Sequence, residues 1–271
     1  MMALDTMRVR AVVRKELRDY RRKRSIVVTM AVLPAMFLIQ PTLSIFLAPS
    51  SVGAKYFRLP LLFLLLIPVI IPSTLAAYSV VGEREQGTLE PLLTTPLRRE
   101  ELILGKAAAV MVPTLAISYA VFGVFLAIVR LFAHPATASA VFRQGPVLLA
   151  LALFAPLLAG WAIVVGMAVS VRASEVRVAQ QLGTLASFPP LGLVVLFGVG
   201  VIHPTFGVAV AFAVGLLAID VRALRIVARM FDRERLVTGA KAARSRTTGR
   251  PPQAGTGGPT QTPRPQQGGT T

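Results

Sequence analysis

The sequence has 271 residues, of which 54% are hydrophobic and only 15% are charged, and its mean hydropathy is +0.67. Soluble domains are typically about 45–50% apolar and about 25% charged, so this composition indicates an integral membrane protein. The chain has no cysteine and only two histidines, His134 and His203, which lie far apart. This excludes disulfides, thiolate metal sites and cysteine nucleophiles, and it argues against a zinc site. No catalytic, cofactor-binding or metal-ligating set is predicted.

Residues 1–25 combine nine Lys and Arg residues with one apolar helix face, which predicts an amphipathic interfacial helix on the inner leaflet. Glu16 falls inside that apolar stripe, where an unpaired carboxylate is costly. Two readings stay open: Glu16 has a basic partner such as Arg84 or Arg98, or it is solvated. The residues that share the apolar face are Val9, Val12, Val13, Leu17 and Tyr20.

Six apolar runs follow, and a run of roughly 20 residues suffices to cross the hydrocarbon core of a bilayer. The sixth run begins near Thr205 and becomes polar at Asp220, so it is short unless the helix continues into the cytosol. The pair Pro189–Pro190 could break the fifth run near its middle. The five longer runs are residues 26–47, 59–81, 107–129, 146–171 and 182–201.

The predicted spans contain no Asp, Glu, Lys or Arg between their ends. Ion-coupled transporters usually place such groups inside the bundle, so proton coupling is not expected and energy for transport must come from another subunit. Small residues in the fourth and fifth spans predict close contacts between helices. These residues are Gly160, Gly166, Ser170, Gly183 and Ser187.

The distribution of basic residues sets the expected orientation. Of the 29 Lys and Arg residues, 25 fall on the side of the membrane that carries both termini, and all 12 acidic residues fall on that side too. By the positive-inside rule, both termini are cytoplasmic, in the inner or plasma membrane of the cell. The fold class predicted is therefore an all-α integral membrane protein with six spans.

The cytoplasmic loop 82–106 carries the most informative motif. Gly87 can end the preceding helix, Thr88 is a natural N-cap, and Pro96 ends a new helix after about two turns. Its apolar residues Leu89, Leu92 and Leu93 follow an i, i+3, i+4 pattern and form a single knob. A helix this short is not stable alone in water, so the knob either packs onto its own bundle or docks into the groove of a partner.

This loop, with Gly105 and Lys106 opening the next span, resembles the signature of ABC-2 type transporter permeases, the membrane subunits of ATP-binding-cassette exporters. The basic N-terminal segment, including Lys15-Glu16-Leu17-Arg18, also resembles that family. The resemblance implies a coupling helix that contacts a separate ATPase subunit, which would bind the ATP and Mg. The residues that it assigns to this contact are Glu83, Arg84, Glu85, Gly87, Thr88, Leu89, Glu90, Leu92 and Leu93.

The chain has no ATP-binding loop of its own, because GxxxxGK[ST] does not occur and the only Gly-Lys pair, Gly105-Lys106, is followed by Ala107. The resemblance therefore implies a non-enzymatic permease subunit that pairs with a second permease half, as a homodimer or heterodimer, and with two ATPase subunits. An ion-coupled secondary transporter and a membrane scaffold or assembly factor are the alternatives. No residue set selects a substrate among drugs, lipids, glycans and ions.

The C-terminal region divides at about residue 238. Before it, basic residues line one helix face directly after the sixth span, which favours anionic inner-leaflet lipids over nucleic acid as the partner. Residues 238–271 are almost devoid of apolar side chains and predict a disordered cytoplasmic tail. The expected organisation is thus the helix 1–25, a permease domain 26–237 and the tail. The basic face comprises Arg222, Arg225, Arg229 and Arg233.

Overall fold

The computed structural model describes residues 6–48, 54–85, 99–201 and 206–230, and within these ranges every regular element is a helix. A short helix and two 3-10 turns interrupt the longer helices. The elements are α1 (Thr6–Arg22), α2 (Arg24–Phe46), η1 (Ala54–Phe57), α3 (Arg58–Phe63), η2 (Leu64–Leu66), α4 (Ile67–Glu85), α6 (Arg99–Phe132), α7 (Pro135–Phe142), α8 (Gly145–Arg172), α9 (Val176–Val199) and α10 (Phe206–Met230).

Among the described residues, five stretches are long and apolar enough to cross a membrane, and they coincide with the five longer predicted runs. The sixth predicted run lies within α10, which is helical but is not one of these five. The five stretches are Ile26–Phe46, Lys55–Ala77, Glu100–Phe132, Gly145–Arg172 and Val176–Leu196.

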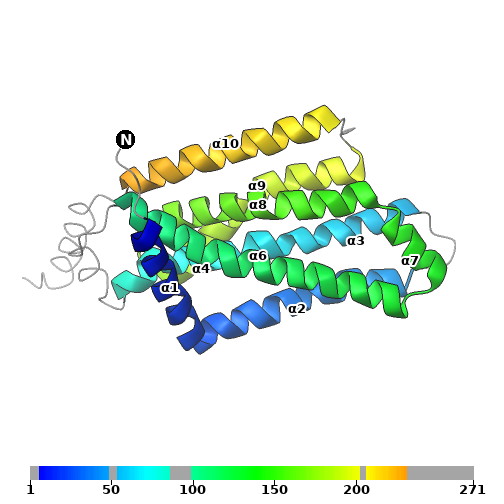
Figure 1. Ribbon diagram of the computed structural model, residues 1–271, viewed down its shortest axis with the longest axis horizontal. Coiled ribbons are helices and arrows are strands. Elements are labelled where there is room, and N and C mark those ends of the chain that lie inside the picture. Colours follow the sequence, from blue (N-terminus) through cyan, green and yellow to red (C-terminus); the bar gives the residue numbers. More distant parts are fainter. Residues whose placement is uncertain (1–5, 49–53, 86–98, 202–205, 231–271) are drawn as a thin grey trace, which may run out of the picture. The chain divides into compact units, whose positions relative to one another are not determined.

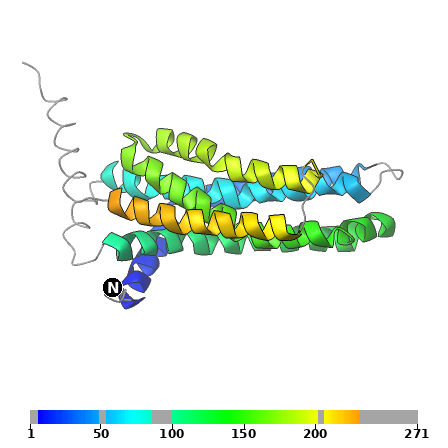
Figure 2. The same ribbon diagram turned by 90° about the horizontal axis from the view of Figure 1, so that it is seen from above.

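The long helices α2, α4, α6, α8, α9 and α10 run alongside one another, while α1 crosses one end of this bundle (Figures 1 and 2). The helix α7 lies at the opposite end. The helix α7 was not predicted from the sequence; it begins at Pro135, a residue favoured in the first helical turn. His134 caps it by accepting a hydrogen bond from the backbone N–H of Ala136 at 3.4 Å.

The stretch Lys55–Ala77 forms the centre of the bundle. Within its apolar segment, 72% of the residues are buried, whereas the corresponding figure for Ile26–Phe46 is 18%. This central stretch is not one continuous helix. The ring of Pro68 removes a backbone donor and clashes with the carbonyl of residue 64, so the chain tightens into the 3-10 turn Leu64–Leu66 before α4 begins.

The predicted close contacts between small residues are confirmed where α4, α8 and α9 meet. A Cβ added at Gly166 of α8 would lie 2.9 Å from Ala76 Cβ and 3.1 Å from the Ser73 carbonyl oxygen of α4. A Cβ added at Gly183 of α9 would lie 3.3 Å from the Gly166 Cα. The three backbones therefore approach at distances that only glycine permits.

Hydroxyl groups join the same three helices. The hydroxyls of Ser73 and Thr184 lie 2.9 Å apart, between α4 and α9. Ser170 of α8 donates to the carbonyl of Ala77 and accepts from the backbone N–H of Val81 at 3.1 Å. These bonds satisfy polar groups away from water and fix the register of α8 on α4.

The prediction that Pro189 and Pro190 break the fifth span is wrong, because α9 continues through both residues from Val176 to Val199. In membrane helices, neighbouring helices and side-chain hydroxyls can satisfy the carbonyls that a proline leaves free. Ser187 lies one turn after Gly183, and its hydroxyl donates to the Gly183 carbonyl. Pro190 has no backbone N–H for the Ala186 carbonyl, and the indole N–H of Trp161 on α8 donates to that carbonyl at 3.2 Å.

Candidate functional site

The structure describes the two ends of the predicted coupling loop 82–106 but not its middle, residues 86–98. Glu83, Arg84 and Glu85 form the last turn of α4, although their side chains lie outside the description. The next described residue is Arg99, where α6 begins. The remaining predicted contact residues, Gly87, Thr88, Leu89, Glu90, Leu92 and Leu93, lie outside the described residues.

The helix α6 begins eight residues before the predicted span at 107–129, at Arg99. Glu100 and Glu101 occupy its first turn, where negative charge is favourable beside the positive end of the helix dipole. Leu102 and Ile103 are buried, so this first part of the helix is packed against the protein. The helix that follows the loop thus extends without a break from the loop into the bundle.

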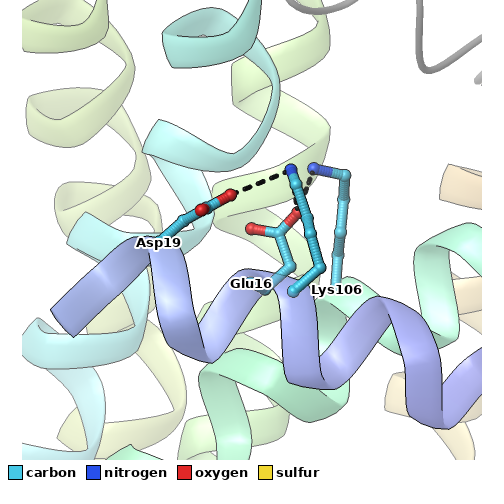
Figure 3. A network of polar contacts seen from close by, with 4 residues as sticks. Glu16, Asp19 and Lys106 are labelled. Atoms are coloured by element: carbon cyan, nitrogen blue, oxygen red, sulfur yellow. Dashed lines mark hydrogen bonds and ion pairs between the residues drawn. The ribbon is translucent and has the colours of Figure 1, made fainter. Parts of the chain in front are cut away.

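A buried ion pair joins α1 to this part of α6 (Figure 3). The ammonium of Lys106 lies 3.1 Å from the carboxylate of Glu16, and the Lys106 side chain is fully buried while that of Glu16 is 6% exposed. Lys15, whose side chain is 47% exposed, also lies 3.2 Å from the Glu16 carboxylate and 3.2 Å from that of Asp19. One buried and one half-exposed cation therefore neutralise a buried carboxylate.

Two further contacts place α1 on the beginning of α6. Gly105 leaves room for Val12, because a Cβ at residue 105 would come within 2.6 Å of Val12 Cγ1. One helical turn away, the guanidinium of Arg8 lies 3.8 Å from the buried carboxylate of Glu101. The glycine thus permits the close approach that brings the charges together.

The environment of Glu16 decides between the two interpretations of this residue, a basic partner or solvation. Glu16 is 5% exposed, so the solvated reading is wrong and the prediction of a basic partner is confirmed. Its described partners are Lys106 and Lys15, while the side chains of the two suggested arginines, Arg84 and Arg98, lie outside the described residues. The buried face of α1, formed by Val12, Glu16 and Tyr20, packs against protein, with α6 as its main neighbour.

Two charged residues at the ends of predicted spans are buried in the structure. Lys106 lies within the candidate span Glu100–Phe132 and is fully buried. Asp220 is 8% exposed and faces Gly160 of α8. The hydropathy pattern assigned both residues to the edges of spans. For Asp220, a signal was present, because apolar residues resume after it at Val221, Leu224 and Val227.

These features define a multi-pass membrane protein that is helical throughout its described elements, with a buried charge network where its main cytoplasmic loop is predicted. The model of the ABC-2 family transporter proteins matches residues 10–216, which is most of the chain. The protein belongs to this family. A search of curated proteins gives no match.

Proposed function

We propose that the chain is the permease subunit of an ABC exporter, which forms the substrate pathway together with a second permease half. A separate subunit binds ATP and Mg and supplies the energy, because the chain has no phosphate-binding loop. The observation that carries this proposal is the family match over residues 10–216, which includes the whole of the loop 82–106.

The proposed organisation has six spans, with α10 as the sixth, and both termini in the cytoplasm. Residues 1–25 form the N-terminal helix, 26–237 the permease domain and 238–271 a cytoplasmic tail. Arg222 and Arg225 are exposed on α10 and support contact with anionic lipid headgroups of the inner leaflet of the cell membrane. The strong excess of basic residues on the proposed cytoplasmic side supports this orientation.

The proposed coupling element is the loop between α4 and α6, which contacts the ATPase subunit. Leu89, Leu92 and Leu93 form the apolar anchor, and Glu83, Glu85 and Glu90 are polar contacts around it. Arg84, Gly87 and Thr88 complete the motif: the glycine and threonine shape the short helix that presents the leucines.

The contacts around the loop support a route for transmitting movement. A displacement of the loop acts on the start of α6, which is a single helix from Arg99 to Phe132. The Lys106–Glu16 pair makes α1 move with that helix, because separating the two charges would leave both buried and unpaired. At its other end the loop is continuous with α4, which packs against α8 and α9.

Co-purification tests the proposal. The tagged permease is expressed with the ATPase encoded by a neighbouring gene that contains a phosphate-binding loop. We expect the two proteins to purify together in detergent and the permease to change the rate of ATP hydrolysis after reconstitution. An ATPase carrying an inactivating substitution of its phosphate-binding lysine is the control for the hydrolysis measurement.

Two results would contradict this function. A permease that binds no ATPase but moves substrate in response to an ion gradient would be a secondary transporter. A permease that binds the ATPase without any effect on hydrolysis or transport would be a scaffold or assembly factor.

A further inference from the structure

Asp220 is a buried carboxylate that the ion-pair network of α1 and α6 does not include. Its Oδ1 atom is buried and has no hydrogen-bond partner among the described residues. The other oxygen, Oδ2, faces α8, where a Cβ added at Gly160 would lie 2.8 Å from it. The absence of a side chain at residue 160 therefore makes the space that the carboxylate occupies.

Its depth makes this carboxylate unusual. Gly160 lies near the middle of α8, whose whole length Gly145–Arg172 is a candidate membrane span. Ionisable groups at such depth are costly, and in membrane proteins they are typically paired with another charge or with a ligand. The structure provides the carboxylate but, among the described residues, no cation to pair with it.

The Asp220 side chain lines a cavity of about 370 Å³ between α6, α8 and α10. Ligand sites for small molecules typically measure about 300–1,000 Å³. Among the described residues that line the cavity, Asp220 is the one ionisable group, and the walls are apolar. Leu104 and Met111 come from α6, Ile163 from α8 and Leu217 from α10.

We propose that this cavity binds an amphiphilic organic cation, whose protonated nitrogen pairs with Asp220 while its apolar body lies against the walls. A metal ion would need several oxygen ligands, and the lining offers a single carboxylate. An anion would meet a like charge, and a hydrocarbon would leave the carboxylate unpaired. A single cationic nitrogen on an apolar body can pair with the carboxylate while the body packs against the apolar walls.

The site lies within this one chain, so binding requires no ATPase subunit. The binding test therefore succeeds or fails independently of the proposed function in ABC transport. If the cation is also transported, the site identifies its chemical class.

The test uses the purified full-length chain in lipid nanodiscs with tritiated imipramine, a tricyclic tertiary amine, as the probe. We expect saturable binding that excess unlabelled imipramine abolishes. Iminodibenzyl, which has the same ring system without the amine side chain, should compete at least about 10-fold more weakly, because a charge-assisted hydrogen bond is absent.

Two variants locate the binding in this cavity. Asp220→Asn keeps the shape but removes the charge and should weaken binding at least about 10-fold. Ala108→Phe keeps the carboxylate but fills the cavity that Ala108 lines, and it should weaken binding by a similar factor. The control is Glu175→Gln, which removes an exposed carboxylate away from the cavity and should leave binding unchanged.

Elution volume and melting temperature verify that each variant is folded. If Asp220→Asn does not fold, Ala108→Phe and the iminodibenzyl competition still decide the matter. Absence of saturable binding by the wild-type chain would overturn the proposal. Equal binding by the folded Asp220→Asn or Ala108→Phe variant would overturn it as well, as would equal competition by iminodibenzyl.

Discussion

Replacing Lys106 by Met is the sharpest test of how α1 is held on α6. The substitution keeps an unbranched side chain of similar length but removes the cation that lies 3.1 Å from Glu16. The Glu16 carboxylate, which is 6% exposed, would then face an apolar side chain. Lys15 remains 3.2 Å away, but its own side chain is 47% exposed, so the surrounding water weakens this interaction.

The magnitude follows from this difference in burial. Removing one partner of a buried ion pair costs about 3–5 kcal/mol, and a half-exposed pair such as Lys15–Glu16 returns about 0–1 kcal/mol, so we expect a loss of about 2–5 kcal/mol. Lys15→Met is the matched control, because it removes a cation from the same carboxylate at the surface. It should cost about 1 kcal/mol or less.

Limited proteolysis measures the loss of free energy that holds α1 on α6. Trypsin can cut after Arg18 inside α1, and because protease cleavage requires an extended backbone, cutting there requires the helix to open, which its packing on α6 opposes. Lys106→Met should raise the cleavage rate at least about 30-fold, against about 5-fold or less for Lys15→Met. The double variant Glu16→Met, Lys106→Met should return close to the wild-type rate, since no buried charge is left unpaired.

Equal cleavage of the wild type and Lys106→Met would refute the role of the pair. A double variant that is as labile as Lys106→Met would show that the methionine itself, rather than the unpaired Glu16, is responsible. Melting temperatures in detergent provide the check that the rest of the bundle is folded.

Three further predictions concern packing, topology and the tail. Gly105→Ala should loosen α1 by about 1–3 kcal/mol in the same proteolysis assay, because the new Cβ meets Val12, whereas Gly123→Ala, with open space around residue 123, should be neutral or stabilising. Reporter fusions should indicate the outside after residues 52 and 138 and the cytoplasm after 90, 176 and 245; an outside signal at 90 would overturn the orientation. Truncation after residue 238 should leave membrane insertion and ATPase binding unchanged, and failed assembly would make the tail a binding element.

The sequence was sufficient to predict five of the six proposed spans, because hydropathy depends on local composition. Five long apolar runs became the five candidate spans, and the small residues of α8 and α9 lie where close packing was expected. For Glu16, a carboxylate in an apolar stripe, the sequence left a basic partner and solvation as two open interpretations, and the structure shows the basic partner. The family motif in the loop further indicated the class of protein that the family match then established.

The features that the sequence did not predict depend on how distant helices align. Lys106 is 90 residues from Glu16 along the chain, and only the docking of Val12 on Gly105 brings the two together. The depth of Asp220 is set by the register of α10 against Gly160, which hydropathy does not report. Likewise, the continuity of α9 through Pro189 and Pro190 depends on tertiary contacts rather than on local propensity.

The most direct test of the proposed coupling role is a pull-down of the ATPase subunit by the permease variant Leu92→Ala, Leu93→Ala. A buried apolar anchor at an interface typically loses about 2 kcal/mol or more on truncation, so association should weaken at least about 30-fold while the permease still inserts. Glu85→Ala should weaken association less. The matched control is Leu149→Ala, Leu153→Ala, which truncates two exposed leucines of α8 and should bind the ATPase like the wild type. Unchanged association and unchanged ATP hydrolysis in the Leu92, Leu93 variant would contradict the account and reduce the loop to a packed turn between two spans.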